Sequence, residues 1–346
     1  MLRQLAHLTR PLPAAGPGAL AVAVYGDALN RHVDAKESGY EGVACVDDAA
    51  RLLDVLCDVW LRTRLPSIER WARGMLDFVL WMQDDDGRWV NFVYGWDGEK
   101  NHEGLTSVRG ENFWHARALL GLSNAWLVFK DERAERAMSA GLAHAAEKPA
   151  PADVRAVHME VARRLIRTGA TTMVPVLDGW AQELAACRID GVLMNSLEET
   201  GTPHLWAHIQ EGVLADAGVL LGEDAFVTAA EASARELLIP VVEGGFDRVS
   251  VSPYDVSSAI FSLDRLARAR DDGGWSSLAE DARAWFSGRN AAGAPVYDED
   301  RGRVADGVDE GRVSENSGAE SNIVAAEALM DRAMATASLA EVPAAG

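Results

Sequence analysis

The strongest constraint on the fold is an alternation between two kinds of helical segment along almost the whole chain. Apolar periodicity and the placement of breaker residues predict twelve helices, over residues 17–32, 47–64, 67–83, 111–129, 132–147, 151–168, 171–187, 203–220, 223–240, 254–269, 275–288 and 315–337. Every second segment is rich in small and apolar residues around most of its circumference. These segments contain "DDAARLLDVL" (47–56), "WHARALLGL" (114–122), "AVHMEVARRL" (156–165), "HIQEGVLADAG" (208–218), "DVSSAIFSL" (255–263) and "ESNIVAAEAL" (320–329). A helix that is apolar nearly all round is buried on most sides.

The segments between them are amphipathic, as in "SIERWARGMLDFVLWMQ" (67–83), and are expected to lie outside. Six buried helices alternating with six amphipathic ones predict an all-α (α/α)6 toroid. Strand-like pieces at 88–96 and 244–251 predict short β-hairpin insertions. An open solenoid of helical hairpins is the alternative, but the long, irregular loops before the buried helices favour a closed ring. Because no linker or composition shift divides the chain, residues 1–346 are expected to form a single domain.

Composition narrows the class of protein further. The formal net charge of −20 argues against binding to a nucleic-acid backbone. No run approaches the roughly 18 apolar residues needed to cross a bilayer, and the start of the chain resembles an amphipathic helix more than a signal peptide. Three scattered cysteines suit a reducing cytoplasm. There is no phosphate-cradling glycine motif and no serine nucleophile elbow, so no cofactor is predicted.

In such a toroid, the loops that lead into the buried helices converge on one face. Here these loops carry acidic and aromatic side chains, in "GYEGVACVDD", "SVRGENFWH", "SLEETGTPHLW", "VSVSPYD" and "GRVSENSGAE". Flat aromatic rings stack on the apolar faces of sugars, and carboxylates accept hydrogen bonds from hydroxyl groups. The pattern therefore predicts a cleft that binds a neutral, hydroxyl-rich ligand.

Three stretches resemble the six-hairpin-glycosidase type of toroid. More narrowly, they resemble a bacterial group found alone or fused to glycosyltransferase domains. The stretches are "ACVDDAARLLDVL" (44–56), similar to "TVDDNARAL"; residues 84–122, similar to "DGxFxNF…GSEDSHGRALWALG"; and residues 296–329, similar to "YD…GGCxDGL…NxGAES". Their order and spacing agree over roughly four-fifths of the chain. The second stretch departs from the group at residues 111–114, which read Glu-Asn-Phe-Trp in place of Ser-Glu-Asp-Ser. The resemblance implies carbohydrate chemistry without fixing the reaction.

A second resemblance is to the triterpene cyclases, which also use helical toroids. Residues 73–89, "RGMLDFVLWMQDDDGRW", fit the Gln-Trp repeat of that family, but the repeat occurs once. The aspartate-rich protonating motif is missing, because "VDD" lacks its first aspartate. The terpene hypothesis is therefore much the weaker one.

Four carboxylates at the starts of buried helices are candidate catalytic residues. Asp47 and Asp48 open one such helix, and one of them is expected to cap it, since exposed N–H groups favour an anion there. Glu320 forms a predicted capping box with Ser317, and the family resemblance gives it a possible catalytic role as well. Glu111 opens a further buried helix.

Seven other side chains on the same segments are candidate substrate-binding residues. For the tryptophans and the histidine, the alternative to ligand stacking is packing in the helical core. The candidates are Trp89, Trp114, His115, Trp206, Tyr254, Asp255 and Asn316. No metal is predicted, although His204 and His208 are spaced to share a helical face with Glu211.

The favoured hypothesis is an inverting glycoside hydrolase that acts on an oligosaccharide or glycoside. Glu111, packed against aromatic side chains, would be the proton donor because burial raises its pKa. Asp48, at a helix N-terminus, would be the anionic base. Inversion requires the two carboxyl groups to be roughly 6.5–9.5 Å apart.

Two other classes of function remain open. One is a sugar-binding or partner-docking toroid without catalysis, acting beside a glycosyltransferase. The other is a sugar or uronic acid isomerase or lyase, with Tyr254 and a histidine as acid and base and with Arg51 or Arg117 holding the substrate.

Overall fold

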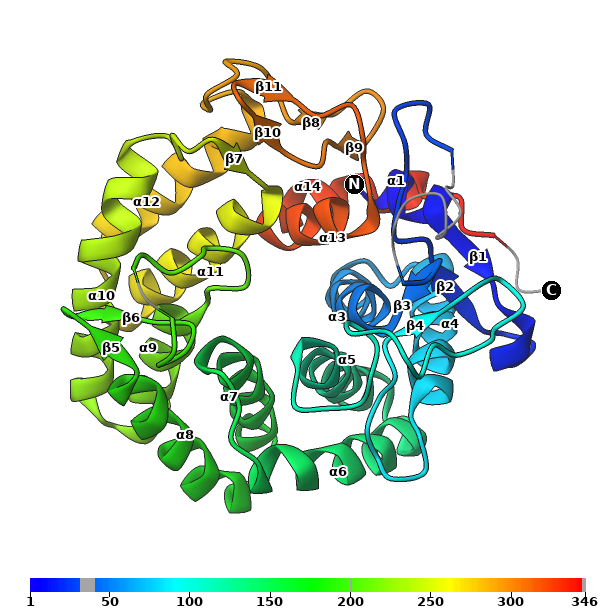
Figure 1. Ribbon diagram of the computed structural model, residues 1–346, viewed down its shortest axis with the longest axis horizontal. Helices are drawn as coiled ribbons and strands as arrows, with labels where there is room; N and C mark the ends of the chain where they lie inside the picture. The colour runs from blue at the N-terminus through cyan, green and yellow to red at the C-terminus, as the bar shows by residue number, and fades with distance from the viewer. Residues whose placement is uncertain (32–40, 200, 344–346) are drawn as a thin grey trace. The chain divides into compact units, whose positions relative to one another are not determined.

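The computed structural model describes residues 1–31, 41–199 and 201–343 (Figure 1). The chain forms two compact units. One comprises Met1–Pro149, Asp298–Asp306 and Glu315–Gly346, and we call it the terminal unit. The other comprises Ala150–Tyr297 and Gly307–Ser314, and we call it the middle unit. Both ends of the chain therefore contribute to the same unit.

The terminal unit is built on two buried helices, α3 (Val46–Thr63) and α5 (Phe113–Phe129), which pack on each other. The amphipathic helix α4 (Pro66–Met82) covers α3, and α6 (Glu132–Glu147) covers α5. The C-terminal helix α13 (Ala319–Ala328) packs on α3 and on the N-terminal helix α1 (Leu2–Leu8). Helix α14 (Met330–Ala335) and the 3-10 turns η1 (Pro13–Ala15) and η4 (Ala337–Leu339) complete the helical part.

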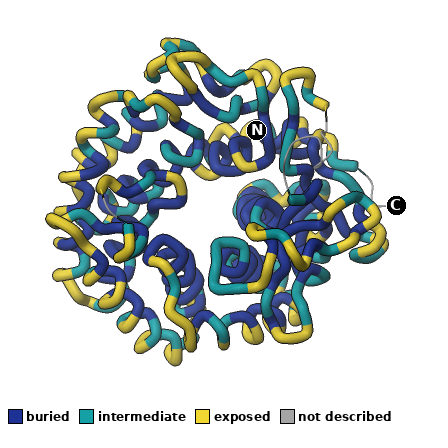
Figure 2. The backbone as a smooth tube through the Cα atoms, in the orientation of Figure 1, coloured by how far each residue is buried: buried dark blue, intermediate teal, exposed yellow. Residues whose placement is uncertain are grey.

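Close packing of α3 against α5 depends on a glycine. A Cβ atom added at Gly121 of α5 would lie 2.5 Å from the backbone oxygen of Ala50 in α3. Both helices are dark blue over most of their length in Figure 2, which marks them as buried, whereas α6 alternates between buried and exposed residues. The predicted division into buried and amphipathic helices is therefore observed in this unit.

Short antiparallel strands tie the loops of the terminal unit to its helices. Strand β1 (Thr9–Pro11) pairs with β2 (Leu20–Val22), and β3 (Ala44–Cys45) pairs with β4 (Phe92–Val93). Strand β9 (Arg303–Val304) also belongs here, and β8 (Tyr297–Asp298) spans the border between the units. The β3–β4 pair brings the 84–107 loop to the start of α3.

The middle unit repeats the pairing of buried and covering helices. The more buried helices are α7 (Ala152–Arg167), α9 (Gln210–Leu221) and α11 (Pro253–Arg270). They pack respectively on α8 (Val174–Ala186), α10 (Asp224–Glu243) and α12 (Gly273–Arg283). The unit also contains η2 (Thr171–Met173), η3 (Ala284–Ser287), the hairpin β5 (Arg188–Ile189)–β6 (Val192–Leu193), and a sheet ordered β11 (Arg312–Val313)–β10 (Val308–Asp309)–β7 (Ser250–Val251).

The first predicted helix, over residues 17–32, is wrong. Residues 20–22 form strand β2, buried against β1, and the helix near this end is α1 at residues 2–8. Gly16 has a φ of 125°, which favours glycine and sets a turn before the strand. Residue 32 lies outside the described residues.

Two predicted helix starts are also corrected. Helix α9 begins at Gln210 rather than at residue 203. Helix α13 begins at Ala319, where no side chain forms a cap hydrogen bond, so the predicted Ser317–Glu320 capping box is wrong. The Ser317 hydroxyl donates instead to the carbonyl of Val304, at 2.7 Å. None of the helices in the described ranges is long and apolar enough to cross a bilayer.

Candidate functional site

Neither of the two aspartates at the start of α3 caps the helix. Cys45 is the N-cap, and its sulfur accepts a hydrogen bond from the Asp48 N–H at 3.4 Å. Asn91 in the neighbouring loop accepts from the Asp47 N–H at 3.1 Å and donates through its side chain to Thr106 at 2.9 Å. The expectation that an aspartate caps this helix is therefore wrong. Both carboxylates are available for other contacts.

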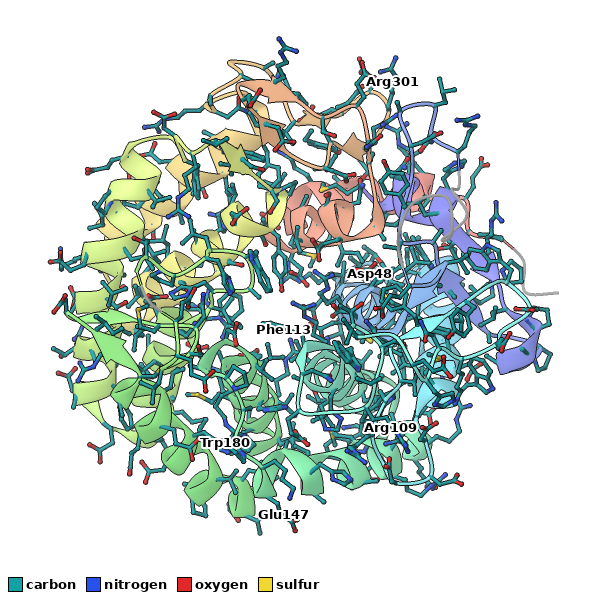
Figure 3. All side chains as sticks on the ribbon, in the orientation of Figure 1. Asp48, Arg109, Phe113, Glu147, Trp180 and Arg301 are labelled. Atoms are coloured by element: carbon teal, nitrogen blue, oxygen red, sulfur yellow. The ribbon has the colours of Figure 1, made fainter. Side chains whose placement is uncertain are left out.

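Arg51 joins Asp48 to Glu320. Its Nη2 atom lies 2.7 Å from Asp48 Oδ1 and 3.0 Å from Glu320 Oε2, so these two oxygens are at most 5.7 Å apart, the sum of the two distances. The Asp48 and Arg51 side chains are buried, whereas the Glu320 side chain is 49% exposed. Figure 3 labels Asp48 at the start of α3. Two predicted catalytic residues, 272 positions apart in sequence, thus meet on one guanidinium.

Asp47 has a different partner. Arg117, one turn into α5, donates to Asp47 Oδ1, and the Arg117 guanidinium also lies over the ring of Phe113, 4.5 Å from its centroid. Arg51 Nε is 4.0 Å from the same carboxylate. Burial opposes ionisation of Asp47, but the charges of Arg117 and Arg51 outweigh it and lower the pKa of this carboxyl group.

Asp48 is shifted in the opposite direction. Burial raises its pKa to about 6; the charges of Glu320 and Asp47 add to this shift, and the guanidinium of Arg51 opposes it. Burial thus shifts the pKa of Asp48 in the direction opposite to the one expected for a carboxylate at a helix N-terminus. Neighbouring carboxylates with opposite pKa shifts are the arrangement in which one group gives a proton and another stays ionised.

A fourth carboxylate fixes the helix that carries Glu320. Asp306 Oδ1 accepts from the Gly318 N–H at 2.7 Å and from the Ser321 hydroxyl at 2.8 Å. Burial raises the pKa of Asp306, and the charge of Glu320 contributes to the increase. Asn316, a predicted substrate-binding residue, accepts from the Asp306 N–H through its carbonyl, at 3.0 Å. We refer to Asp47, Asp48, Arg51, Arg117, Asp306 and Glu320 as the carboxylate cluster.

Glu111 lies just before Asn112, the N-cap of α5. The Asn112 side chain accepts from the His115 N–H at 3.2 Å. Glu111 is partly buried. The residue of α5 that reaches the Asp47 carboxylate is Arg117, so this helix contributes a cation to the carboxylate cluster.

The predicted aromatic residues of this unit divide by burial. Trp89 is fully buried, and its indole N–H donates to the Val79 carbonyl at 2.8 Å. His115, against the Trp89 ring, is fully buried too, and burial lowers its pKa to about 4. Its Nε2 atom lies 3.1 Å from the Gly141 carbonyl, which fixes a proton on that nitrogen in the neutral ring. Trp89 and His115 thus have the packing role, whereas Trp114 is half-buried and donates to the Trp89 carbonyl at 3.2 Å.

In the middle unit, Asp255 is committed to the start of α11. It forms a capping box with Ser252, in which each side chain bonds the other residue's backbone N–H. Tyr254, beside it, is partly buried. Trp206 is 42% exposed, and its ring stacks on His204 with the centroids 3.9 Å apart and the planes at 5°. Of the predicted residues in this unit, Trp206 presents the most surface to a ligand.

His204 and His208 do not share a helical face, because both precede α9. His208 is fully buried between Asn195 Oδ1, at 2.7 Å, and Glu211 Oε1, at 3.1 Å. Within the described part of the chain, no three histidine, cysteine, aspartate or glutamate side chains form a group that could hold a metal ion. The cysteines Cys45, Cys57 and Cys187 are buried free thiols.

Sequence reasoning named Arg51 and Arg117 only as holders of a substrate carboxylate, and it missed Asn91, Cys45 and Asp306. A signal existed for Arg51, since residues three and four apart on a helix are neighbours and Arg51 follows both aspartates at those spacings. No local signal connects Arg117 or Asp306 to the carboxylate cluster, because their partners are distant in sequence.

No protein-family model matches the chain, and no curated protein matches it in sequence. Solved structures do match in fold. A sugar epimerase from a ruminal bacterium superposes with a TM-score of 0.69 at 10% identity, covering 96% of this chain and 97% of that chain. A D-mannose isomerase superposes with a TM-score of 0.68 at 10% identity, covering 95% of this chain and 96% of that chain.

A family 9 glycoside hydrolase, endoglucanase J30, gives a TM-score of 0.56 at 12% identity over 96% of this chain and 84% of that chain. The chain has the (α/α)6 toroid fold. The predicted fold class is thereby confirmed, and so is the resemblance to the six-hairpin-glycosidase type of toroid. At these identities the likeness concerns the fold, and the reaction has to be argued from the side chains.

Proposed function

We propose that the chain is a carbohydrate-active enzyme that hydrolyses a glycosidic bond at the carboxylate cluster. The observation that carries the proposal is the opposite shift of two adjacent carboxyl groups: the pKa of Asp47 is lowered and that of Asp48 is raised to about 6. Hydrolysis of a glycoside needs one carboxyl group that donates a proton and one that stays ionised.

Asp48 and Glu320 act as one proton donor. Both carboxylates bind the same nitrogen of Arg51, and the charge of Glu320 acts on Asp48. Glu320 is the exposed member and contacts the substrate, while Asp48 is buried behind it. The pair protonates the leaving oxygen of the glycoside. The two oxygens are at most 5.7 Å apart, which is too close for the water that an inverting reaction places between acid and base.

The base is therefore Asp47 rather than Asp48. Arg117 and Arg51 keep Asp47 ionised, and its side chain is 20% exposed, so water can reach it. Asp47 activates that water for attack on the anomeric carbon. These roles replace the earlier assignment of Glu111 as acid and Asp48 as base, and they retain inversion as the predicted outcome.

A sugar isomerase or epimerase is the second candidate. The epimerase and isomerase structures superpose on this chain with higher TM-scores, 0.69 and 0.68, than the endoglucanase at 0.56. In this reaction the Asp48–Glu320 pair would take a proton from the carbon next to the carbonyl and return it, and Arg51 would hold the carbonyl oxygen. The same residues serve both candidates, so the products decide between them.

The test is NMR of the purified protein in D2O with oligosaccharides of varied linkage and with free aldoses. New reducing-end signals indicate hydrolysis, and their first anomer shows whether configuration inverts. Deuterium incorporation at C2 of an aldose indicates isomerisation. We expect Asp47→Asn and Glu320→Gln each to reduce the rate by about 10²–10⁴-fold.

Asp85→Asn is the matched control, because Asp85 is an exposed aspartate outside the carboxylate cluster. It should keep the wild-type rate. Turnover that survives unchanged in both cluster variants would refute the assignment of the site. Saturable binding of a sugar with no turnover would instead support the non-catalytic binding module.

A further inference from the structure

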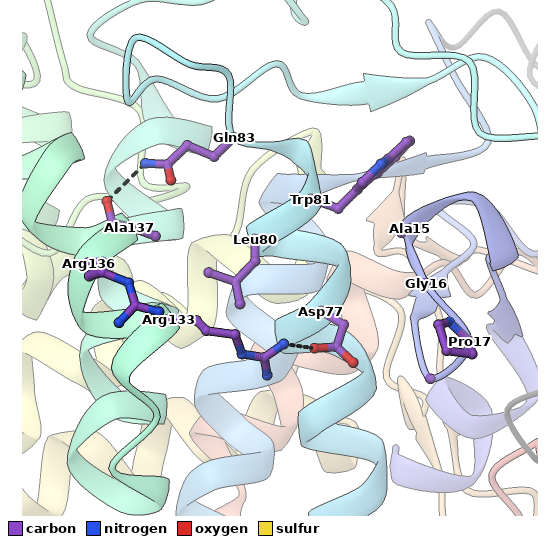
Figure 4. Close-up of a pocket in the computed structure, with 11 residues that line it drawn as sticks. Ala15, Gly16, Pro17, Asp77, Leu80, Trp81, Gln83, Arg133, Arg136 and Ala137 are labelled. Carbon is purple, nitrogen blue, oxygen red and sulfur yellow. Dashed lines mark hydrogen bonds and ion pairs between the residues drawn. The ribbon is translucent and has the colours of Figure 1, made fainter.

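A groove on the terminal unit lies away from the residues used so far. It has a volume of about 730 Å³ and runs between α4, α6 and the turn that follows η1 (Figure 4). Its lining residues are Ala15, Gly16, Pro17, Gly18, Asp77, Leu80, Trp81, Gln83, Arg133, Arg136 and Ala137. None of them belongs to the carboxylate cluster. The volume is within the range of about 300–1,000 Å³ typical of small-molecule sites.

The charges that line the groove are already paired within the protein. Arg133 donates to Asp77 Oδ1 at 2.8 Å (Figure 4). It also donates to Asp131 at 2.8 Å, and Arg136 lies 3.5 Å from Glu132. The hydrogen bond to Asp131 raises the pKa of Arg133, so this guanidinium stays charged and matched by its own carboxylates. An anionic ligand would have to compete with those carboxylates. A neutral ligand would not.

The two carboxylates also restrain the Arg133 side chain, which is 52% exposed. A guanidinium held by two carboxylates keeps its remaining N–H groups at set positions, which lowers the entropy lost when a ligand binds. These N–H groups and the Asp77 carboxylate offer both donors and acceptors to hydroxyl groups. Such a mixture suits a ligand whose hydroxyls both donate and accept.

The rest of the lining supplies apolar surface. Leu80 and Ala137 form part of the wall, and Trp81 adds a half-buried indole ring. The Lys100 ammonium lies 5.0 Å from the centroid of the Trp81 ring. Gly16 and Gly18 have no side chains to fill the space opposite. An aromatic ring beside fixed donors and acceptors is the combination that binds the alternating apolar and hydroxyl surfaces of a sugar.

We propose that this groove binds a neutral carbohydrate chain, as a second sugar site separate from the carboxylate cluster. The juxtaposition of Trp81 with the Asp77–Arg133 pair carries the inference. Bound there, an oligosaccharide or polysaccharide is anchored to the protein by sugar units other than those that react. The inference goes beyond the proposed reaction and does not depend on it, because binding here needs no turnover.

The test uses Gly18→Met, which blocks the groove without removing a contact. A Cβ atom at Gly18 meets only Asp77 Oδ2, at an ordinary 3.4 Å, so the backbone there tolerates a Cβ. Trp81→Ala removes the ring as a second, independent change. Gly179→Met is the matched control, because Gly179 lies on the exposed side of α8 with nothing within 4 Å of its added Cβ.

Calorimetric titration with linear cello-, manno- and malto-hexaoses measures the affinity, and circular dichroism checks the fold of each variant. We expect Gly18→Met and Trp81→Ala to lose one binding event with at least a tenfold drop in affinity, while Gly179→Met binds as wild type. Turnover of a short glycoside should be unchanged in Gly18→Met.

Two outcomes would overturn the proposal. One is that both groove variants bind every hexaose as wild type does. The other is that the variants lose binding of inorganic phosphate, titrated in parallel, instead of binding of a hexaose. Failure of the proposed reaction would appear as absence of turnover in wild type, which the binding measurement does not use. The two conclusions can therefore fail separately.

Discussion

At the scale of single residues, one nitrogen of Arg51 connects two carboxylates that differ in exposure. When Asp48 is protonated, below a pH of about 6, the Nη2 atom of Arg51 keeps the Glu320 carboxylate as its charged partner. When Asp48 is ionised, both carboxylates share the same nitrogen. The charge on a buried side chain thereby controls the electrostatics of an exposed one.

Replacing Arg51 should move the pH dependence of the reaction. In Arg51→Met, the cation that opposes the raised pKa of Asp48 is gone, so that pKa rises further. We expect the ionisation assigned to Asp48 to shift upward by about one pH unit or more in a profile of kcat/KM from pH 4 to 9. Arg51→Lys keeps a charge and should shift it less. If the profile of Arg51→Met keeps the apparent pKa of wild type and only the maximal kcat/KM changes, Arg51 does not control the ionisation of Asp48.

His115 should make the fold sensitive to acid. Its pKa in the folded state is about 4, against 6.5 for a free histidine. As pH falls below 6.5, the unfolded chain takes up a proton that the folded protein does not. The contribution of neutral His115 to the free energy of unfolding is therefore fully present above pH 6.5. It is lost between pH 6.5 and 4, by an amount on the order of 3 kcal/mol.

Urea unfolding at pH 7.5, 6 and 5 measures this effect. As the pH is lowered, the free energy of unfolding should decrease more steeply in wild type than in His115→Gln, whose side chain does not titrate. Asp48 acts in the opposite sense, because its raised pKa means that the folded state gains a proton as pH falls through 6. That contribution is present in both proteins and cancels in the comparison. Parallel curves would rule out the assigned role of His115.

The sequence could identify three acids of the carboxylate cluster, but not Asp306 and not the directions of the pKa shifts. Asp47, Asp48 and Glu320 are found because they open buried helices, a property visible in the pattern of apolar residues. The direction of the Asp48 shift depends on burial beside Glu320, which follows it by 272 positions. Trp89 shows the same limit, since the strand-like alternation around it does not reveal that its ring lies in the core.

At the scale of helices, burial on several sides leaves a strong mark in the sequence. The predicted 132–147 helix matches α6 at both ends, and the predicted 47–64 helix differs from α3 by one residue at each end. The failure at residues 17–32 has a physical cause: a short buried strand and one turn of a buried helix are both simply apolar. Only pairing with β1, which is a tertiary contact, decides between them.

Gly121 offers a test of the contact between α3 and α5. In Gly121→Ala the new methyl group would lie 2.5 Å from the Ala50 oxygen, so the two helices have to separate. We expect a loss of about 1–3 kcal/mol in the free energy of unfolding, as for other overpacked cores. Chemical denaturation measures it.

Gly179→Ala in α8 is the control for this prediction, because its added Cβ meets nothing within 4 Å. Alanine there should stabilise the protein by up to about 1 kcal/mol through helix propensity. Equal effects of the two substitutions would mean that α3 and α5 are not packed as closely as described.

At the scale of the whole molecule, the (α/α)6 fold follows from the repeated alternation of helix types, whereas the division into two compact units has no mark in the composition. The prediction that residues 1–346 are a single domain is tested by calorimetry. The chain passes from one unit to the other after residues 149, 297, 306 and 314, so unfolding either unit releases several constraints on the other. We therefore expect one cooperative transition.

For 346 residues the calorimetric enthalpy near 60 °C should be about 240 kcal/mol, and it should equal the van't Hoff value. Two resolved transitions, or a van't Hoff enthalpy well below the calorimetric one, would show that the two units unfold as separate domains.

The order of the chain has a consequence for how the protein is made. Arg51 and Glu320 are 269 residues apart, and the helix α13 that carries Glu320 packs on α1 and α3. At about 5–20 residues per second, a ribosome produces Glu320 some 13–54 s after Arg51. Until then Arg51 and Asp48 lack their contact with Glu320, and α1 and α3 lack their contact with α13. The contact between Arg51 and Glu320 can therefore form only after α13 has been synthesised.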